Sequence, residues 1–149
     1  MRLYVCIGIS GSGKSTWAAK CSTQCRVVST DKIREFMFGD ESVQSHPEDV
    51  FDEAYKEIFK YLLEGKNVIF DATNLRRVYR RKLFEMFGGM AELIAVDFGC
   101  DCARAIENQY KRDRHVPEQV VRAQSKRYEK PTYDEGWVDI VSMEVYQDE

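Results

Sequence analysis

The chain has 149 residues, of which 44% are hydrophobic and 32% are charged, and its formal net charge is −3 at pH 7. This length suffices for one well-buried domain and is too short for two ordinary ones. No stretch approaches the roughly 20 consecutive apolar residues of a membrane span, and the N-terminus lacks the cleavage site of a signal peptide. We therefore expect a cytoplasmic globular protein with no membrane partner.

The acidic balance disfavours a strongly electrostatic nucleic-acid binder, but the charges are unevenly spread along the chain. Residues 76–82, RRVYRRK, hold five cations in seven positions. This segment would bind a nucleic-acid backbone, with Tyr79 available for stacking, or it would form an ordinary solvated helix face. The sequence leaves both interpretations open.

The cysteines indicate ordinary thiols rather than a disulfide framework or a metal site. Their number is odd, and disulfides are rare in intracellular proteins. The spacings within the two close pairs differ from the C-x2-C spacing that is typical of zinc ligands. The five positions are Cys6, Cys21, Cys25, Cys100 and Cys102.

Short apolar segments alternate along the chain with segments of helical character. Strands are expected at 2–9, 25–30, 67–73, 91–99 and 138–145. Helices are expected at 14–21, 31–38, about 47–65, 75–87, 101–110 and 117–128. Apolar residues in the third helix repeat at a four-residue step from Val50 to Leu63. Because the strand segments are nearly continuous in apolar residues, the alternation predicts a parallel sheet covered on both faces.

Residues 8–16, GISGSGKST, lie between the first expected strand and the first expected helix. Their spacing, G-x-x-x-x-G-K-S, is that of a loop whose backbone wraps around the phosphates of a nucleoside triphosphate. Glycines allow the backbone to approach the phosphates closely. The residues predicted to bind ATP and its phosphates are Gly8, Ser10, Gly11, Ser12, Gly13, Lys14, Ser15 and Thr16.

Two residues of this loop have specific expected roles. Lys14 is expected to reach the β- and γ-phosphates, and the Ser15 hydroxyl is expected to bind Mg²⁺. ATP and Mg²⁺ are therefore the expected substrate and cofactor. The alternative is a glycine-rich turn without a ligand, but a strand before the loop and a helix after it are the context of a phosphate site.

Two further strands are expected to end in carboxylates, VVSTD in Asp31 and VIFD in Asp71. Because ligands of open α/β sheets bind beyond the carboxyl ends of the strands, both should lie near the triphosphate. Arg34 follows Asp31 by three residues and shares its helix face. We expect Asp31 to accept a hydroxyl proton while Arg34 holds an anionic group of the acceptor. A helix cap or a structural ion pair is the alternative for Asp31.

Asp71 is expected on the metal side of the site, either as a direct ligand or through water. The alternative is a carboxylate that only orders the following turn. Asn74 is equally open between a turn former and a polar contact to the acceptor. These two residues therefore have structural as well as functional interpretations.

Four segments in this order, GISGSGKSTW, STDKIR, VIFDATNL and KRYEKPTYDEGW, resemble the kinase domain of polynucleotide 5′-hydroxyl kinases. That domain occurs in the bacteriophage end-healing enzyme and in the animal DNA-repair kinase/phosphatase. The resemblance covers nearly the whole chain and implies a single P-loop kinase domain over 1–149. It also implies a three-layer α/β P-loop NTPase fold, with a five-stranded parallel sheet in the order 2-3-1-4-5 and an arginine-bearing helical lid near 111–117. The PTYDEGW stretch is structural in the family.

The resemblance implies roles for individual residues by position. Asp31 resembles the general base that activates the 5′-hydroxyl, and Arg34 resembles the arginine that grips the acceptor's phosphate. Arg112, in NQYKRDRHVP, falls where the lid arginine clamps the phosphoryl donor, and Arg114 is the alternative because the lid spacing differs slightly. Lys14, Asp31 and Arg112 form the expected catalytic set.

The resulting hypothesis is ATP-dependent transfer of the γ-phosphoryl group to the 5′-hydroxyl end of RNA or DNA, with a ligase as a candidate partner in end repair. No acidic D-x-D motif occurs, so the 3′-phosphatase activity of the bacteriophage and animal enzymes should be absent. Two alternatives stay open. One is a small-molecule P-loop kinase that acts on a nucleoside, sugar acid or antibiotic, and the other is a non-catalytic NTP-binding module.

Overall fold

Five parallel strands form one sheet in the residues that this computed structural model describes, 1–40, 46–111 and 116–143. The strands are β1 (Arg2–Gly8), β2 (Arg26–Ser29), β3 (Val68–Asp71), β4 (Glu92–Gly99) and β5 (Asp139–Ser142). Their order is β2-β3-β1-β4-β5, and every neighbouring pair is parallel. The predicted sheet and its strand order are confirmed.

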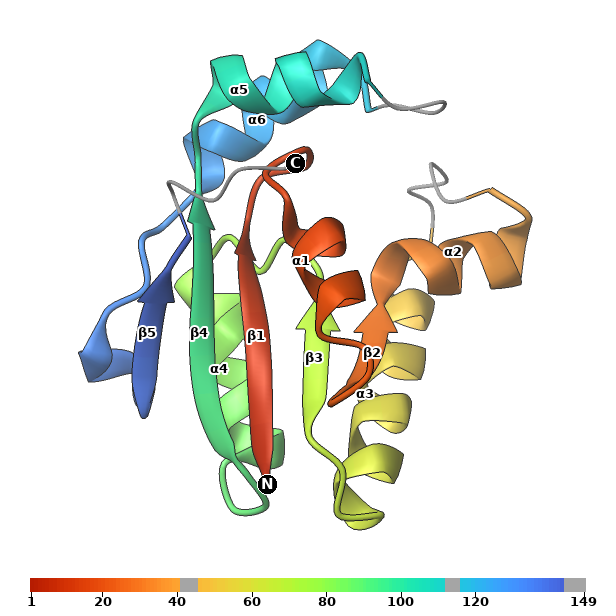
Figure 1. Cartoon of the computed structure of the whole chain (residues 1–149), viewed down its shortest axis with the longest axis vertical. Helices are drawn as coiled ribbons and strands as arrows, with labels where there is room; N and C mark the ends of the chain where they lie inside the picture. The colour runs from red at the N-terminus through yellow and green to blue at the C-terminus, as the bar shows by residue number, and fades with distance from the viewer. Residues whose placement is uncertain (41–45, 112–115, 144–149) are drawn as a thin grey trace.

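Helices cover both faces of the sheet, as Figure 1 shows. One face carries α1 (Lys14–Lys20), and the opposite face carries α3 (Pro47–Leu63) and α4 (Arg77–Phe87). The other helices lie toward the C-terminal ends of the strands: α2 (Thr30–Phe38), α5 (Cys102–Gln109) and α6 (Glu118–Arg127). These three layers confirm the expected α/β architecture. Among the described helices, none is long and apolar enough to cross a membrane.

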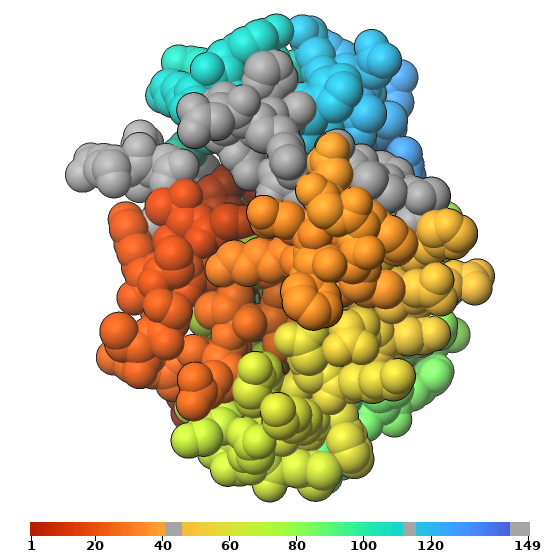
Figure 2. Space-filling model, turned by 90° about the vertical axis from the view of Figure 1, so that its right-hand side faces the viewer, coloured from red at the N-terminus to blue at the C-terminus, as the bar shows by residue number. Residues whose placement is uncertain are grey.

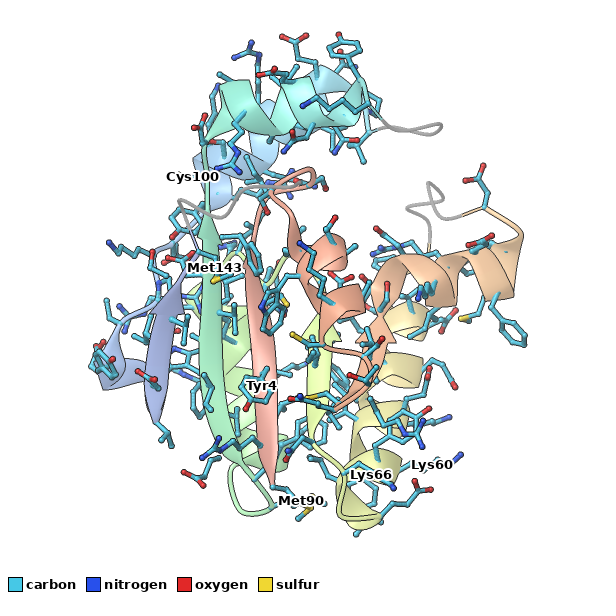
Figure 3. All side chains as sticks on the ribbon, in the orientation of Figure 1. Tyr4, Lys60, Lys66, Met90, Cys100 and Met143 are labelled. Carbon is cyan, nitrogen blue, oxygen red and sulfur yellow. The ribbon has the colours of Figure 1, made fainter. Side chains whose placement is uncertain are left out.

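The main core lies between the sheet and α3. The inward-facing side chains of α3 have the four-residue spacing expected from the sequence and are fully buried: Val50, Ala54, Ile58 and Leu62. Burial of each larger aliphatic side chain stabilises the fold by roughly 1.5–3 kcal/mol. A smaller core fills the face that α1 covers, where Ala18 is buried and where Tyr4 and Met143, labelled in Figure 3, pack against the cluster.

The C-terminal ends of the strands meet at one edge of the sheet. β2 and β3 pair in register, so Ser29 lies beside Asp71 at that edge. β1 and β4 pair regularly up to Ile7, where the register shifts as β1 leads into the phosphate loop. The Gly8 amide donates to the Thr73 carbonyl at 3.0 Å. The start of the loop is therefore fixed to the chain that follows β3.

The basic segment 76–82 contains a buried arginine. Arg80 is fully buried, and its Nε and Nη2 donate to Glu135 Oε1 and Oε2 at 2.8 and 3.1 Å. Its Nη1 donates to the carbonyl oxygens of Asn74 and Leu75 at 3.0 and 2.9 Å. Arg80 therefore holds the turn after β3 against the turn that contains Glu135, and it is not available to a nucleic-acid backbone.

Two neighbouring arginines pair with acidic residues of the same region. Arg77 Nη2 lies 2.8 Å from Asp134 Oδ2, and Arg76 Nε lies 3.6 Å from Glu129 Oε1. Asp134 belongs to the 3-10 helix η1 (Tyr133–Glu135). Such surface pairs contribute little to stability, but they offset much of the positive charge of the segment. The helix is thus a weaker electrostatic attractor than its sequence indicates.

Candidate active site

The phosphate loop runs from the end of β1 to the first turn of α1. Gly13 precedes α1 with a left-handed backbone, φ 101°, and Gly11 has φ 86°. Residues with a Cβ rarely adopt these angles, which accounts for glycine at both positions. The amide of Ser12 donates to the carbonyl of Ile9 at 3.2 Å and closes a turn between them. The loop has the compact path expected of a phosphate-binding site.

Lys14 is only 8% exposed, and its ammonium group is held by the phosphate loop. Its Nζ donates to the carbonyl oxygens of Ile9 at 2.7 Å and Gly8 at 3.0 Å. Hydrogen bonds between ionised groups are stronger than those to neutral carbonyls, so phosphate oxygens would be better partners for this ammonium. The contact of Lys14 with the β- and γ-phosphates stays a prediction.

Ser15 and Asp71 are brought together from α1 and from the end of β3. Ser15 Oγ donates to Asp71 Oδ2 at 2.8 Å. Asp71 is 7% exposed, and burial raises the pKa of its carboxyl above the ordinary 3.8, an effect that the Lys14 charge and the Ser15 hydrogen bond partly offset. Mg²⁺ in nucleotide sites usually takes one or two protein oxygens beside phosphate and water. This hydroxyl and carboxylate fit such an ion.

Asp31 stands in the first turn of α2 and does not cap the helix. Helix α2 begins at Thr30, and the cap is Ser29, whose Oγ accepts a hydrogen bond from the Lys32 amide at 3.3 Å. Arg34 Nη1 donates to Asp31 Oδ1 at 3.0 Å, so the ion pair that was the structural alternative for Asp31 is present, and its role as proton acceptor stays a prediction. The Asp31 side chain is 51% exposed and the Arg34 side chain 11%.

Arg34 keeps hydrogen-bonding capacity beyond its pair with Asp31. Its Nε is buried and has no hydrogen-bond partner among the residues that the structure describes. A buried donor without a partner is unfavourable by about 1–3 kcal/mol. The binding of an anionic acceptor group by Arg34 stays a prediction.

A groove of about 320 Å³ connects Asp31 with Ser15 and Asp71. It lies between α1 on one side and β2 with the start of α2 on the other, and its lining is formed by Ser15, Ala18, Ala19, Ser22, Val27, Ser29, Asp31, Lys32 and Asp71. Figure 2 shows this side of the molecule, with the red-orange surface of α1 beside the orange surface of α2. Asp31 and the Ser15–Asp71 pair therefore open onto one space.

The structure does not test the predicted roles of the remaining site residues. Asn74 is buried, and its left-handed backbone, φ 44°, forms the turn after β3. Its Nδ2 donates to the carbonyl of Cys6 at 2.9 Å, so this residue orders the turn, and its contact to an acceptor stays a prediction. Arg112 and Arg114 lie outside the described residues, and their lid role also stays a prediction.

None of the five cysteines forms a disulfide bond. Cys100, labelled in Figure 3, follows β4 below the α5–α6 pair. In residues 1–40, 46–111 and 116–143, no group of three or more His, Cys, Asp or Glu side chains is arranged to hold a metal ion. Metal binding by Ser15 and Asp71, which share a hydrogen bond beside the loop, stays a prediction.

Sequence reasoning missed two side-chain amides that contact the phosphate loop. Gln124 Oε1 accepts a hydrogen bond from the Ser10 amide at 2.7 Å, and Asn108 Nδ2 donates to the Gly11 carbonyl at 2.9 Å. No local signal separates these two residues from other polar residues on helices. Their partners are set by tertiary structure alone.

A five-stranded parallel sheet in the order 2-3-1-4-5, with a glycine-rich loop between β1 and α1, defines a P-loop domain with nucleotide-binding character. A family model described as an AAA domain matches residues 3–131, and the chain belongs to this family. No curated protein matches the chain in sequence.

Several solved structures share the fold. A chain of the Pnkp1/Rnl/Hen1 RNA repair complex has a TM-score of 0.74 at 21% identity, over 85% of this chain and 43% of that chain. A gluconokinase from Sinorhizobium meliloti 1021 has a TM-score of 0.60 at 24% identity, over 97% and 82%. Kti12 from Chaetomium thermophilum, in complex with ADP-AlF3, has a TM-score of 0.67 at 20% identity, over 99% and 91%. The chain spans less than half of the matched RNA repair chain, and the similarities show a P-loop kinase-like fold.

Proposed function

We propose that the protein transfers the γ-phosphoryl group of ATP to the 5′-hydroxyl end of a nucleic acid. The observation that carries the proposal is the single groove onto which Asp31 and the Ser15–Asp71 pair open. A donor site and a proton acceptor in one space suit phosphoryl transfer, in which positioning and charge stabilisation provide most of the catalysis. A non-catalytic nucleotide-binding module would need the donor site but not the proton acceptor beside it.

On the donor side, Lys14 would exchange its two carbonyl partners for β- and γ-phosphate oxygens. Ser15 and Asp71 would hold Mg²⁺, directly or through water, and the ion supplies positive charge to the transferring group when it is bound. Arg112, or Arg114 as the alternative, would clamp the donor from the lid segment. The family resemblance supports this last assignment.

On the acceptor side, Asp31 takes the proton of the attacking hydroxyl. The hydroxyl oxygen forms a bond to the γ-phosphorus, the bond from that phosphorus to the β–γ bridging oxygen breaks, and ADP leaves. Arg34 orients Asp31 through their 3.0 Å hydrogen bond. Its guanidinium would also bind the acceptor's anionic group, which in a nucleic acid is the phosphate after the first nucleoside.

The choice of a nucleic-acid end rests on the resemblance of the STDKIR, DATN and PTYDEGW segments to polynucleotide 5′-hydroxyl kinases. Similarity to a chain of an RNA repair complex supports the same choice. A ligase that acts on the new 5′-phosphate is the partner we propose. Because arginines of the basic segment 76–82 pair with acidic residues, we expect the active-site residues to make most contacts with RNA or DNA.

A small-molecule acceptor is the second candidate. The gluconokinase match extends over 97% of this chain. The groove of about 320 Å³ also falls in the range of roughly 300–1,000 Å³ that is usual for small-ligand pockets. Under this alternative, Arg34 would bind a carboxylate or phosphate of a small substrate in place of a nucleic-acid phosphate.

An acceptor panel with γ-labelled ATP tests the proposal. The panel contains 5′-hydroxyl DNA and RNA oligonucleotides, the same oligonucleotides already carrying a 5′-phosphate, nucleosides, gluconate and simple sugars. Labelling of 5′-hydroxyl ends, with none on the matched 5′-phosphate ends, is the expected result. Faster labelling of gluconate or of a nucleoside would overturn it. Retained ATP binding with no labelled acceptor would leave only the binding-module alternative.

A further inference from the structure

Two helices, α5 and α6, bind the first half of the phosphate loop through side-chain hydrogen bonds. Figure 1 shows α5 and α6 together at the C-terminal end of the sheet, next to the loop that follows β1. Helix α6 provides Gln124, whose Oε1 accepts a hydrogen bond from the Ser10 amide at 2.7 Å. Helix α5 provides Asn108, whose Nδ2 donates to the Gly11 carbonyl at 2.9 Å. Consecutive residues of the loop are thus tied to different helices.

The approach of α5 to the loop is close enough to require glycine. A Cβ built on Gly11 would lie 2.5 Å from the Ala105 carbonyl oxygen and 2.8 Å from Gln109 Nε2. Gln109 is buried, and its Oε1 accepts a hydrogen bond from the Val116 amide at 2.9 Å. The same side chain therefore contacts the loop and fixes the chain that leads into α6. The helix pair acts as one support for residues 10 and 11.

The loop contacts of this support are made by neutral amides. A carboxylate at position 124 would hold the Ser10 amide as well, but it would repel the phosphates that the loop must accept. A glutamine holds the backbone without opposing the nucleotide.

A loop that is held in place before the nucleotide arrives loses less conformational entropy when it binds. Gln124 and Asn108 hold residues 10 and 11 through contacts that do not involve Lys14, whereas Lys14 would release the carbonyls of residues 8 and 9 to bind phosphate. We propose that Gln124 is a positioning residue of the donor site, which holds the Ser10 peptide group in the conformation that receives the triphosphate. This inference rests on the proposed use of ATP as the donor.

The test compares Gln124→Met, Gln124→Glu and the control Gln119→Met, which changes an exposed residue of the same helix. Gln124→Met keeps the length of the side chain and loses the acceptor oxygen. It should raise the KM and the Kd for ATP by roughly three- to tenfold, the effect of one lost hydrogen bond. The kcat and the KM for the acceptor should stay within about twofold of the unsubstituted protein, as should all constants of Gln119→Met.

Gln124→Glu separates positioning from packing. It retains an acceptor oxygen for the Ser10 amide, so its thermal midpoint without nucleotide should match that of the unsubstituted protein. Its affinity for ATP should nevertheless fall below that of Gln124→Met, because a negative charge now stands beside the phosphates. If the side chain only packs α6, Gln124→Met should instead match the unsubstituted protein in its affinity for ATP.

Hydrogen exchange of the Ser10 amide in nucleotide-free protein completes the test. Faster exchange in Gln124→Met than in Gln119→Met is expected. Unchanged exchange, or an ATP Kd within twofold of the unsubstituted value while the thermal midpoint falls, would overturn the positioning role. If the unsubstituted protein binds no ATP at all, the proposed function fails, and the exchange measurement still shows whether the Ser10 contact exists.

Discussion

Ser15 and Asp71 are 56 residues apart in sequence and share a hydrogen bond of 2.8 Å between Ser15 Oγ and Asp71 Oδ2. The contact joins the first turn of α1 to the last residue of β3. It also places two oxygen atoms at the head of the groove that Asp31 lines. The Asp71 carboxyl at the end of this buried strand is only 7% exposed, which has consequences for both stability and metal binding.

Asp71→Asn should separate these two effects. Because burial raises the pKa of Asp71 above 3.8, the neutral carboxyl is favoured in the folded protein. Its stabilising contribution is full below the unfolded pKa and is lost as the pH rises through the raised folded pKa. The asparagine stays neutral, so the variant without Mg²⁺ should be at least as stable near neutral pH as the unsubstituted protein. Urea unfolding between acidic and neutral pH measures this difference.

The same variant should lose metal-dependent activity. Mg²⁺ needs the ionised carboxylate, so the Mg²⁺ affinity of the unsubstituted protein should rise with pH through the Asp71 pKa. Asp71→Asn should lower the apparent Mg²⁺ affinity or the activity by at least roughly tenfold. Exposed Asp52→Asn is the control and should change neither quantity. An Asp71→Asn enzyme with a normal Mg²⁺ titration would remove Asp71 from the metal site.

Asp31→Asn should abolish transfer while it preserves nucleotide binding. Since Ser29 caps α2 and the Asp31 side chain is half-exposed, the substitution should leave the helix intact. Loss of a general base lowers kcat by roughly 10²–10⁴-fold, and the ATP Kd should stay within about threefold. Glu35→Gln, an exposed change on the same helix, is the control. Transfer by Asp31→Asn at near the unsubstituted rate would show that another group accepts the proton.

Much of the fold could be predicted because its signals are local. The apolar spacing from Val50 to Leu62 marks the buried face of α3, and the loop before Lys14 marks the phosphate site. The proximity of Ser15 and Asp71 followed from topology, since parallel strands end at one edge of a sheet. The strand order, in contrast, came from the family resemblance and not from periodicity.

The burial of Arg80 and the side-chain contacts to the phosphate loop could not be predicted, because they depend on partners distant in sequence. The local pattern of RRVYRRK does not distinguish buried Arg80 from its solvated neighbours, because its position is set by Glu135 and by the carbonyls of residues 74 and 75. The sequence does contain one signal for the turn that holds Glu135. Thr132 and Glu135 have capping-box spacing, and the structure contains that box. The contact between Gln124 and Ser10 has no comparable signal.

Arg80→Met should be strongly destabilising, because it leaves the Glu135 carboxylate buried without its partner. The Arg80 side chain is fully buried and that of Glu135 is 7% exposed. Breaking such a pair from one side costs about 3–5 kcal/mol. Arg81→Met, on the exposed side of the same helix, should change the free energy of unfolding by less than about 0.5 kcal/mol. Equal urea midpoints for the two variants would contradict the buried pair.

Gly11→Ala and Gly39→Ala form a matched pair, since both glycines have left-handed backbones with φ of 86° and 76°. Alanine in this conformation costs roughly 1–2 kcal/mol at either position. A Cβ on Gly39 would have nothing within 4 Å, whereas one on Gly11 would lie 2.5 Å from the Ala105 carbonyl oxygen. Gly11→Ala must therefore move α5 away from the loop.

The free energy of unfolding and the ATP KM of the two variants measure this displacement. Gly39→Ala should lower stability by the backbone cost alone and leave the KM for ATP within about twofold of the unsubstituted value. Gly11→Ala should lower stability further and raise that KM by roughly tenfold or more, because the Asn108 and Gln124 contacts are lost together. Similar KM values for the two variants would show that the contact of α5 with the loop does not contribute to donor binding.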